Sequence, residues 1–199
     1  MSFGFSGCHG SGKTTLARDL ANILGLTLYE TRTSEIAKSL GFNAVADLGP
    51  EDRMNLQELL LENFWEVTQK LPRPFISDRT PVDMLAYALG EMGGMNSDPQ
   101  LGERLERYVE RAIWVTQNTF LSVLITRPLP YYEVDSHRPP QNVGYQRKFQ
   151  LLVEGAAFNL SRINRFVLPM NDHRERMAAA ATHIGEQVEE SMRVKPVIH

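Results

Sequence analysis

The sequence has little cysteine, little net charge and no long apolar run. Among its 199 residues Cys8 is the single cysteine, which excludes an intramolecular disulfide and a cysteine-rich zinc site. A formal net charge of -3 argues against a protein that mainly binds nucleic acid, because that task usually needs a basic excess. The lack of a long apolar run argues against a signal peptide or a membrane span. We therefore expect a cytoplasmic protein that acts on small molecules rather than on nucleic acid or membranes.

Short apolar segments alternate with amphipathic ones along the chain. The apolar segments have the length of buried strands and lie at 2–7, 26–30, 74–77, 119–126 and 165–169. The amphipathic segments have helical spacing and lie at 13–24, 34–41, 50–71, 81–89, from 99, after 144 and at 172–188. Five strands separated by helices predict an α/β fold, a five-stranded parallel sheet with helices on both faces. The length suits a single domain over residues 1–199.

The stretch GCHGSGKTT at 7–15 contains the strongest motif. It matches G-x-x-x-x-G-K-[ST] between a predicted strand and a predicted helix, as that motif requires. Its glycines let backbone N–H groups surround phosphate oxygens, and the positive end of the helix adds to the attraction. Lys13, which we expect to be exposed, would reach the β- and γ-phosphates of ATP, while Thr14 would hold Mg²⁺ and Thr15 would touch the α-phosphate. The predicted ATP-binding residues are Gly7, His9, Gly10, Ser11, Gly12, Lys13, Thr14 and Thr15.

An Asp-Arg pair follows the third predicted strand. Asp78 and Arg79 lie at the carboxyl end of that strand, where open α/β sheets bind their ligands. A carboxylate there would lie near Mg²⁺ or the acceptor, and a guanidinium would lie near the migrating phosphoryl group. Thr80 and Pro81 are typical of a helix start, so the alternative is a pair that only caps a helix and forms a salt bridge.

These stretches resemble the P-loop small-molecule kinases of the nucleoside and nucleotide type. The resemblance rests on GCHGSGKTT, on SDRTPVDMLAYA at 77–88 and on the order of the strands, and it is nearest to thymidylate kinases. The chain is also similar to compact bacteriophage ATPase-kinases and to ribosylnicotinamide kinases. The resemblance implies the P-loop NTPase fold and transfer of the γ-phosphoryl group of Mg·ATP to a nucleotide-like acceptor. It is also compatible with a homodimer.

The resemblance assigns roles to residues on the acceptor side. Glu30 would take a proton from a sugar hydroxyl, as a glutamate does in about this place in deoxynucleoside kinases, or would be purely structural. Arg32 would clamp the phosphate of a monophosphate acceptor. Arg53 and Gln57 share one face of the helix that lines the base pocket in these kinases, where Gln57 would read a base edge unless it faces solvent. His9 would donate a hydrogen bond near the substrate sugar or have no role.

A proline-rich polar segment at 128–147 follows the fourth predicted strand, where such kinases carry a lid. A closing lid excludes water and can bring an arginine to the transferring phosphoryl group. Arg138 is the first candidate for that catalytic arginine and Arg147 is another, while Arg127 would stack on adenine. The alternative is a basic loop without a catalytic role.

The resemblance leaves several acceptors open. We place a (deoxy)nucleoside monophosphate first, because Arg32, Arg53 and Arg79 all fall in segments expected to face the acceptor. A (deoxy)nucleoside or ribosylnicotinamide is the alternative. A P-loop ATPase or switch that acts on a partner is the alternative of another class, and a polynucleotide end-kinase is disfavoured by the negative charge.

Overall fold

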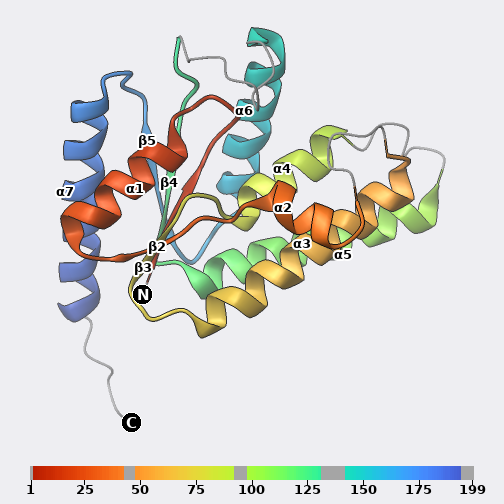
Figure 1. Cartoon of the computed structure of the whole chain (residues 1–199), viewed down its shortest axis with the longest axis horizontal. Helices are drawn as coiled ribbons and strands as arrows, with labels where there is room; N and C mark the ends of the chain where they lie inside the picture. Colours follow the sequence, from red (N-terminus) through yellow and green to blue (C-terminus); the bar gives the residue numbers. More distant parts are fainter. Residues whose placement is uncertain (1, 43–47, 92–97, 131–141, 194–199) are drawn as a thin grey trace.

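A computed structural model describes residues 2–42, 48–91, 98–130 and 142–193 (Figure 1). The strands are β1 (Phe3–Ser6), β2 (Thr27–Tyr29), β3 (Phe75–Ser77), β4 (Ser122–Thr126) and β5 (Asn164–Leu168). The helices in these ranges are α1 (Lys13–Leu24), α2 (Thr33–Ser39), α3 (Pro50–Lys70), α4 (Pro81–Glu91), α5 (Pro99–Thr119), α6 (Val143–Phe158) and α7 (His173–Arg193).

The strands form one parallel sheet in the order β2-β3-β1-β4-β5. This confirms the predicted α/β class and the predicted five-stranded parallel sheet. The chain leaves β1 towards β2 on one side and reaches β4 on the other, so β1 lies where the strand order reverses. In open α/β sheets ligands bind at the carboxyl ends of the strands beside such a point. The loop at 7–12 leaves β1 at this position.

Helices cover both faces of the sheet (Figure 1). On one face Leu16 and Leu20 of α1 and Ile184 of α7 join Phe3 and Phe5 in one buried apolar cluster. On the other face the apolar sides of α3, α4, α5 and α6 form a second cluster. The three central strands β1, β3 and β4 are therefore buried on both sides, which explains why they appear in the sequence as short apolar runs, whereas the edge strands β2 and β5 are partly exposed.

Some element ends differ from the sequence-based expectation. Helix α4 continues to Glu91 rather than ending at Leu89, and α7 continues to Arg193 rather than ending at Val188. Arg193 pairs with Glu189 one turn earlier (N···O 3.3 Å), a spacing that supports an exposed helix end. The fourth strand is shorter than expected because 119 and 120 belong to the end of α5 and its C-cap.

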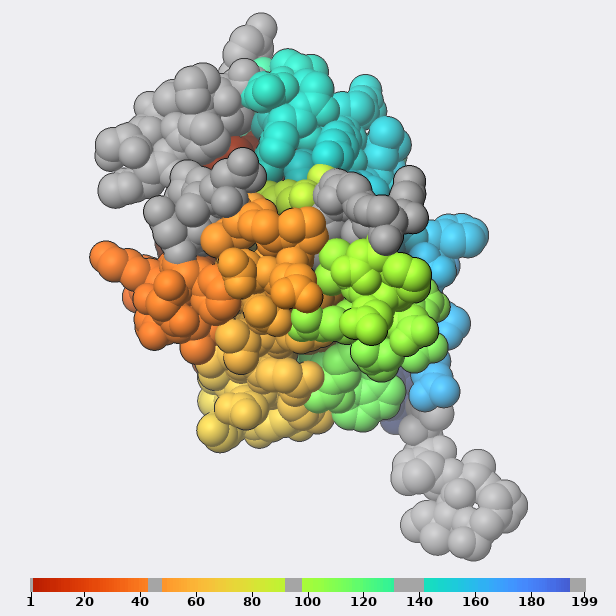
Figure 2. All heavy atoms as spheres, turned by 90° about the vertical axis from the view of Figure 1, so that its right-hand side faces the viewer, coloured from red at the N-terminus to blue at the C-terminus, as the bar shows by residue number. Residues whose placement is uncertain are grey.

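Figure 2 looks onto the face that carries α3 and α5, which lie side by side. Two arginines of α5 tie the helices together, since Arg104 pairs with Glu58 (2.6 Å) and Arg111 pairs with Glu62 (2.8 Å). None of the helices in the described ranges is both long and apolar enough to cross a membrane.

Candidate active site

The loop between β1 and α1 has a conformation that requires its glycines. Gly12 has a φ of 77°, in the left-handed region that favours glycine. A Cβ atom on Gly7 would clash with the backbone oxygen of Thr126 at the end of β4. Ser11 is also fixed to β4, because its hydroxyl accepts a hydrogen bond from Thr126 Oγ1 (2.8 Å). The loop is therefore held against the carboxyl end of the sheet, with Thr15 exposed on the first turn of α1.

Lys13 is buried, so the expectation of an exposed side chain is wrong. Only 6% of the residue is exposed. Its ammonium group donates to the backbone oxygens of Gly7 (2.6 Å) and Cys8 (2.9 Å), and it lies 3.8 Å from Asp83 Oδ1. Burial lowers the pKa of Lys13, and the nearby Asp83 carboxylate opposes that shift. The lysine is thus held inside the loop where phosphates would bind.

Asp83 is a site residue that the sequence reasoning missed. Its Oδ1 accepts from the Gly7 N–H (3.0 Å) and its Oδ2 accepts from the Thr80 N–H (3.1 Å), while 1% of the residue is exposed. Thr80 Oγ1 in turn accepts from the Val82 N–H (3.1 Å), which makes a reciprocal cap at the start of α4. The spacing of Thr80 and Asp83 was the signal that could have revealed it. Burial raises the pKa of Asp83, and Lys13 and Arg79 oppose that effect.

The structure brings the two predicted Mg²⁺ ligands together. Thr14 Oγ1 donates to Asp78 Oδ2 (3.0 Å). The other oxygen of Asp78 accepts from the backbone N–H (2.9 Å) and the hydroxyl (3.1 Å) of Thr31, which holds the carboxylate in place. A carboxylate and a hydroxyl are oxygen ligands of the kind that Mg²⁺ prefers when nucleotide phosphates supply the rest. The donor set therefore fits a Mg·ATP site.

A second missed residue, Arg176, lies on the other side of the loop. Only 2% of this residue is exposed, and its guanidinium donates to three backbone oxygens, of Ser11 (2.6 Å), Met170 (2.6 Å) and Arg127 (3.0 Å). The three acceptors come from the phosphate loop and from the chain after β4 and β5. The Arg127 side chain, our candidate for adenine stacking, is exposed and pairs with Glu154 (3.0 Å). Arg176 thus joins the three segments around the expected ATP site.

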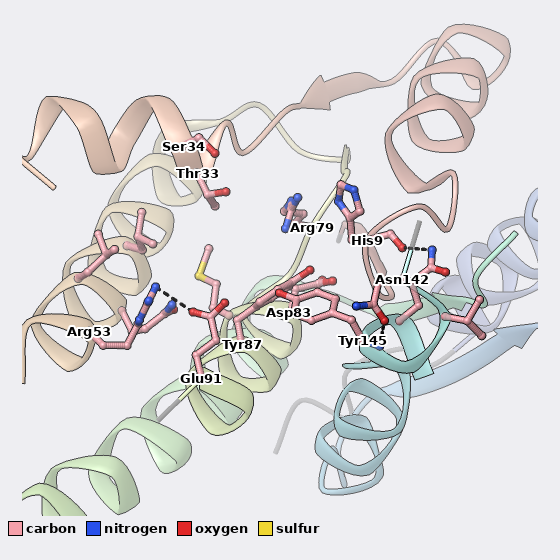
Figure 3. A pocket seen from close by; sticks show the side chains of 16 residues that line it. His9, Thr33, Ser34, Arg53, Arg79, Asp83, Tyr87, Glu91, Asn142 and Tyr145 are labelled. Atoms are coloured by element: carbon pink, nitrogen blue, oxygen red, sulfur yellow. Dashed lines mark hydrogen bonds and ion pairs between the residues drawn. The ribbon is translucent and has the colours of Figure 1, made fainter. Parts of the chain in front are cut away.

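A cavity of about 950 Å³ lies beside the phosphate loop (Figure 3). It is enclosed by that loop, the start of α2, one side of α3, the length of α4 and the start of α6. Its polar lining includes Arg53, Gln57, Arg79, Asp83, Tyr87 and Glu91. The cavity also contains apolar surface from Leu56, Leu60 and Met84, a mixture typical of sites for small organic ligands.

Most of the residues predicted for the acceptor side line this cavity. Gln57 is 6% exposed and accepts from the Tyr108 hydroxyl (3.5 Å), so it does not face solvent. Arg53 pairs with Glu91 (2.9 Å). The Arg79 guanidinium forms no ion pair with any described residue. His9, which we expected either among the ATP-binding residues or near the substrate sugar, lines the acceptor cavity, and its backbone oxygen accepts from a glutamine of α6.

The structure does not bring Glu30 and Arg32 into the cavity. Glu30, which follows β2, pairs with Arg18 of α1 (2.6 Å) outside the cavity. Arg32 is held near Glu30 (3.9 Å) and Glu35 (3.6 Å), with 63% of its side chain exposed. Both residues line a separate shallow depression next to β2. The premise that Arg32 faces the acceptor cavity does not hold in this structure.

The expected lid at 128–147 is described only at its two ends. At its beginning the Leu129 N–H donates to the backbone oxygen of Gly10 (3.2 Å), so the segment starts in contact with the phosphate loop. Its last residues form the first turn of α6, where Arg147 is exposed. Arg138 lies outside the described residues.

Comparisons with known proteins agree with this architecture. A family model with the description AAA domain matches residues 3–176. The deoxyadenosine kinase from M. mycoides with bound dCTP gives a TM-score of 0.62 at 15% identity, covering 94% of this chain and 100% of that chain. A thymidylate kinase from Candida albicans gives a TM-score of 0.57 at 16% identity, covering 96% of this chain and 92% of that chain. No curated protein matches the chain. The likeness to the two solved structures confirms the P-loop NTPase fold.

Proposed function

The chain belongs to the AAA domain family, and from that premise we propose that it transfers the γ-phosphoryl group of Mg·ATP to a nucleoside-type acceptor in the cavity beside the phosphate loop. One observation carries the proposal. Lys13 and Asp83 lie 3.8 Å apart where the loop meets the cavity, so a phosphate-binding cation and a possible proton acceptor share one junction. Transfer requires the attacking oxygen of the acceptor and the leaving oxygen of ATP to lie on opposite sides of the γ-phosphorus. The ATP phosphates and the acceptor hydroxyl must therefore meet at such a junction.

The donor side follows from the loop. Its backbone N–H groups and the start of α1 would hold the phosphates. Lys13 would exchange its two carbonyl acceptors for phosphate oxygens, which carry more negative charge. Thr14 and Asp78 would hold Mg²⁺, which neutralises phosphate charge during transfer. Arg176 would hold the segments that follow β4 and β5 against the phosphate loop.

On the acceptor side we assign Asp83, rather than Glu30, to accept the proton of the acceptor hydroxyl. A general base must lie within hydrogen-bond reach of the proton it takes, and Asp83 lines the cavity whereas Glu30 does not. Each carboxylate oxygen of Asp83 uses one lone pair on a backbone N–H and keeps a second one. Burial raises the pKa of Asp83, which makes it a better proton acceptor than an exposed aspartate. Arg79 would stabilise the migrating phosphoryl group.

The charges of the cavity support a nucleoside-type acceptor over a monophosphate. The monophosphate expectation relied on three arginines, but Arg32 lies outside the cavity and Arg53 is paired with Glu91. Among the lining residues the formal charges of Arg53 and Arg79 equal in number those of Asp83 and Glu91, while Lys13 lies 3.8 Å from Asp83 and is not part of the lining. A monophosphate therefore stays the second candidate, and the observation that favours it is the Arg79 guanidinium, which forms no ion pair with a described residue.

An acceptor panel tests the proposal. The protein is incubated with Mg·ATP and with each of a set of nucleosides, ribosylnicotinamide and their monophosphates, and products are identified by mass spectrometry. We expect a nucleoside-type acceptor to gain one phosphoryl group. Consumption of ATP that is indifferent to every acceptor would instead support the ATPase or switch alternative.

A further inference from the structure

Between β2 and α2 the chain makes a sharp turn beside the predicted Mg²⁺ ligands. Arg32 has a φ of 38° and a ψ of 44°, and it is the one residue other than glycine with a positive φ in the described ranges. Its backbone oxygen accepts from the N–H groups of Glu35 (2.9 Å) and Ile36 (3.1 Å), so this residue caps the start of α2. A left-handed conformation is unfavourable for a residue with a Cβ atom, and residues held in it are concentrated at functional sites. The contacts of its neighbour Thr31 explain why the turn is kept.

Thr31 binds one oxygen of the Asp78 carboxylate with two donors. Its backbone N–H (2.9 Å) and its hydroxyl (3.1 Å) both donate to Asp78 Oδ1. Both residues are buried, with 1% of Thr31 and 5% of Asp78 exposed. The Asp78 N–H donates to the Tyr29 backbone oxygen (3.1 Å), so the end of β2 and the residues after it fix both the main chain and the side chain of Asp78. The two donors of Thr31 fill the two lone pairs of Oδ1.

The second carboxylate oxygen of Asp78 is left for the metal ion. Oδ2 accepts from the Thr14 hydroxyl (3.0 Å) and from no other group among the described residues. It keeps a lone pair, and the Thr14 oxygen keeps its own lone pairs because it acts as the donor in this contact. The two oxygens that would bind Mg²⁺ thus lie side by side, and Thr31 lies behind one of them. Groups that orient a metal ligand in this way typically change metal affinity by about 10- to 100-fold when they are removed.

Resting on the Mg·ATP site of the proposed function, we propose that Thr31 is a positioning residue for the Mg²⁺ ligand Asp78, and that the left-handed backbone of Arg32 brings Thr31 to it. Thr31 occupies Oδ1 and so directs Oδ2 towards Thr14. It does not touch the metal ion or the phosphates itself.

The backbone of Arg32, rather than its side chain, serves this role. The guanidinium is exposed and pairs with two glutamates on the outer surface. Strand β2 is fixed in the sheet and α2 packs on α3, and a left-handed residue at position 32 joins the two with Thr31 facing Asp78. The turn continues into Thr33 and Ser34, which line the acceptor cavity (Figure 3), so it also connects the Mg²⁺ site to the wall of that cavity.

The test measures how much Mg²⁺ strengthens nucleotide binding. Calorimetry gives the affinity for β,γ-imido-ATP, an analogue that is not hydrolysed, once with saturating Mg²⁺ and once in EDTA, and the ratio of the two affinities is the Mg²⁺ gain. Thr31→Val keeps the shape of the side chain and removes its donor, so it should lower the gain by about tenfold and leave the affinity in EDTA unchanged. Thr31→Ser keeps the hydroxyl and should keep most of the gain.

The matched control is Thr68→Val in α3. Thr68 is as buried as Thr31, and its hydroxyl donates to the Trp65 backbone oxygen (3.1 Å) outside the cavity. This variant should leave the Mg²⁺ gain unchanged. A second pair of variants tests the backbone of Arg32, since Arg32→Asn and Arg32→Val both remove the guanidinium. Asparagine adopts the left-handed conformation readily and a β-branched residue does not, so only Arg32→Val should lower the gain.

Three results would overturn the inference. They are an unchanged gain in Thr31→Val, an equal loss of affinity with Mg²⁺ and in EDTA, which a merely structural role would produce, and the same gain in Arg32→Asn and Arg32→Val. No binding of the analogue would overturn the inference and the proposed function together. The predicted loss of gain in a protein that phosphorylates no compound of the acceptor panel would overturn the proposed function and leave the inference standing.

Discussion

The Thr14 hydroxyl donates a hydrogen bond to the Asp78 carboxylate across 3.0 Å, which links the first turn of α1 to the end of β3. Removing the hydroxyl while keeping the shape should weaken Mg²⁺ binding more than it weakens the fold. We expect Thr14→Val to lower Mg²⁺-dependent turnover by about 10²-fold and Thr14→Ser to keep most of it. Turnover measured across a Mg²⁺ titration checks this. Equal losses in the two variants would show that the hydroxyl is not a ligand.

Arg176 should affect ATP more than the acceptor. Its guanidinium joins the phosphate loop to the segments after β4 and β5 through three different nitrogens, and the single nitrogen of a lysine does not reproduce that spread of donors. We expect Arg176→Lys to raise KM for ATP by about tenfold or more, since misplaced binding groups are costly, while KM for the acceptor changes little. Arg174→Lys on the exposed side of α7 is the control. Equal changes in KM for ATP and KM for the acceptor would instead indicate that Arg176→Lys perturbs the whole fold.

The acceptor-side assignment predicts a contrast between two carboxylates. Asp83→Asn should reduce kcat/KM by on the order of 10²-fold or more, because a positioned base contributes about that much. Glu30→Gln should have a mild effect, since Glu30 lies outside the cavity. Thermal unfolding of both variants verifies that they fold. The reverse pattern would return the base role to Glu30.

Arg79 and Arg32 should likewise differ in how much activity is lost when each is replaced. Arg79→Ala removes a cavity guanidinium that forms no ion pair with a described residue, and it should cost about 10²-fold or more in kcat/KM. Arg32→Ala removes an exposed side chain that pairs with Glu30 and Glu35, and it should keep most of the activity. A larger loss in Arg32→Ala than in Arg79→Ala would favour the monophosphate acceptor, with Arg32 as its clamp.

Cys8 should be inert towards alkylation in the folded protein. Burial raises the pKa of its thiol to about 11, against the weaker opposing effect of Lys13. The nucleophilic thiolate is therefore scarcer at neutral pH than for an ordinary cysteine. Iodoacetamide labelling followed by mass spectrometry should be slow in the native protein and fast in urea. Rapid native labelling would contradict the buried position.

The sequence predicted the framework of the site because its signals are local. Buried strands need continuous apolar residues, and the phosphate loop needs its glycines at fixed positions, as Gly12 illustrates. Asp78 and Thr14 could be expected to meet because both lie at the carboxyl edge of one parallel sheet. Asp83 also has a local signal in the sequence, its capping spacing with Thr80.

Other parts of the site depend on contacts between distant segments. Arg176 binds backbone oxygens from three places in the chain. Every residue has a backbone oxygen, so the sequence does not indicate which ones accept these hydrogen bonds. Glu91 was missed because its helix was expected to end at Leu89. Arg32 was assigned to the cavity from its place after a strand, but two neighbouring glutamates hold it on the outer surface.

The most direct test of the central claim is the fate of the γ-phosphoryl group. ATP labelled with ³²P at that position is mixed with Mg²⁺ and the acceptor that the panel identifies, and label is counted in the phosphorylated acceptor and in inorganic phosphate. We predict that most label enters the acceptor, that little reaches water, and that Lys13→Ala lowers the transfer by about 10²-fold or more. Label that appears as inorganic phosphate at the same rate with and without acceptor would contradict the account.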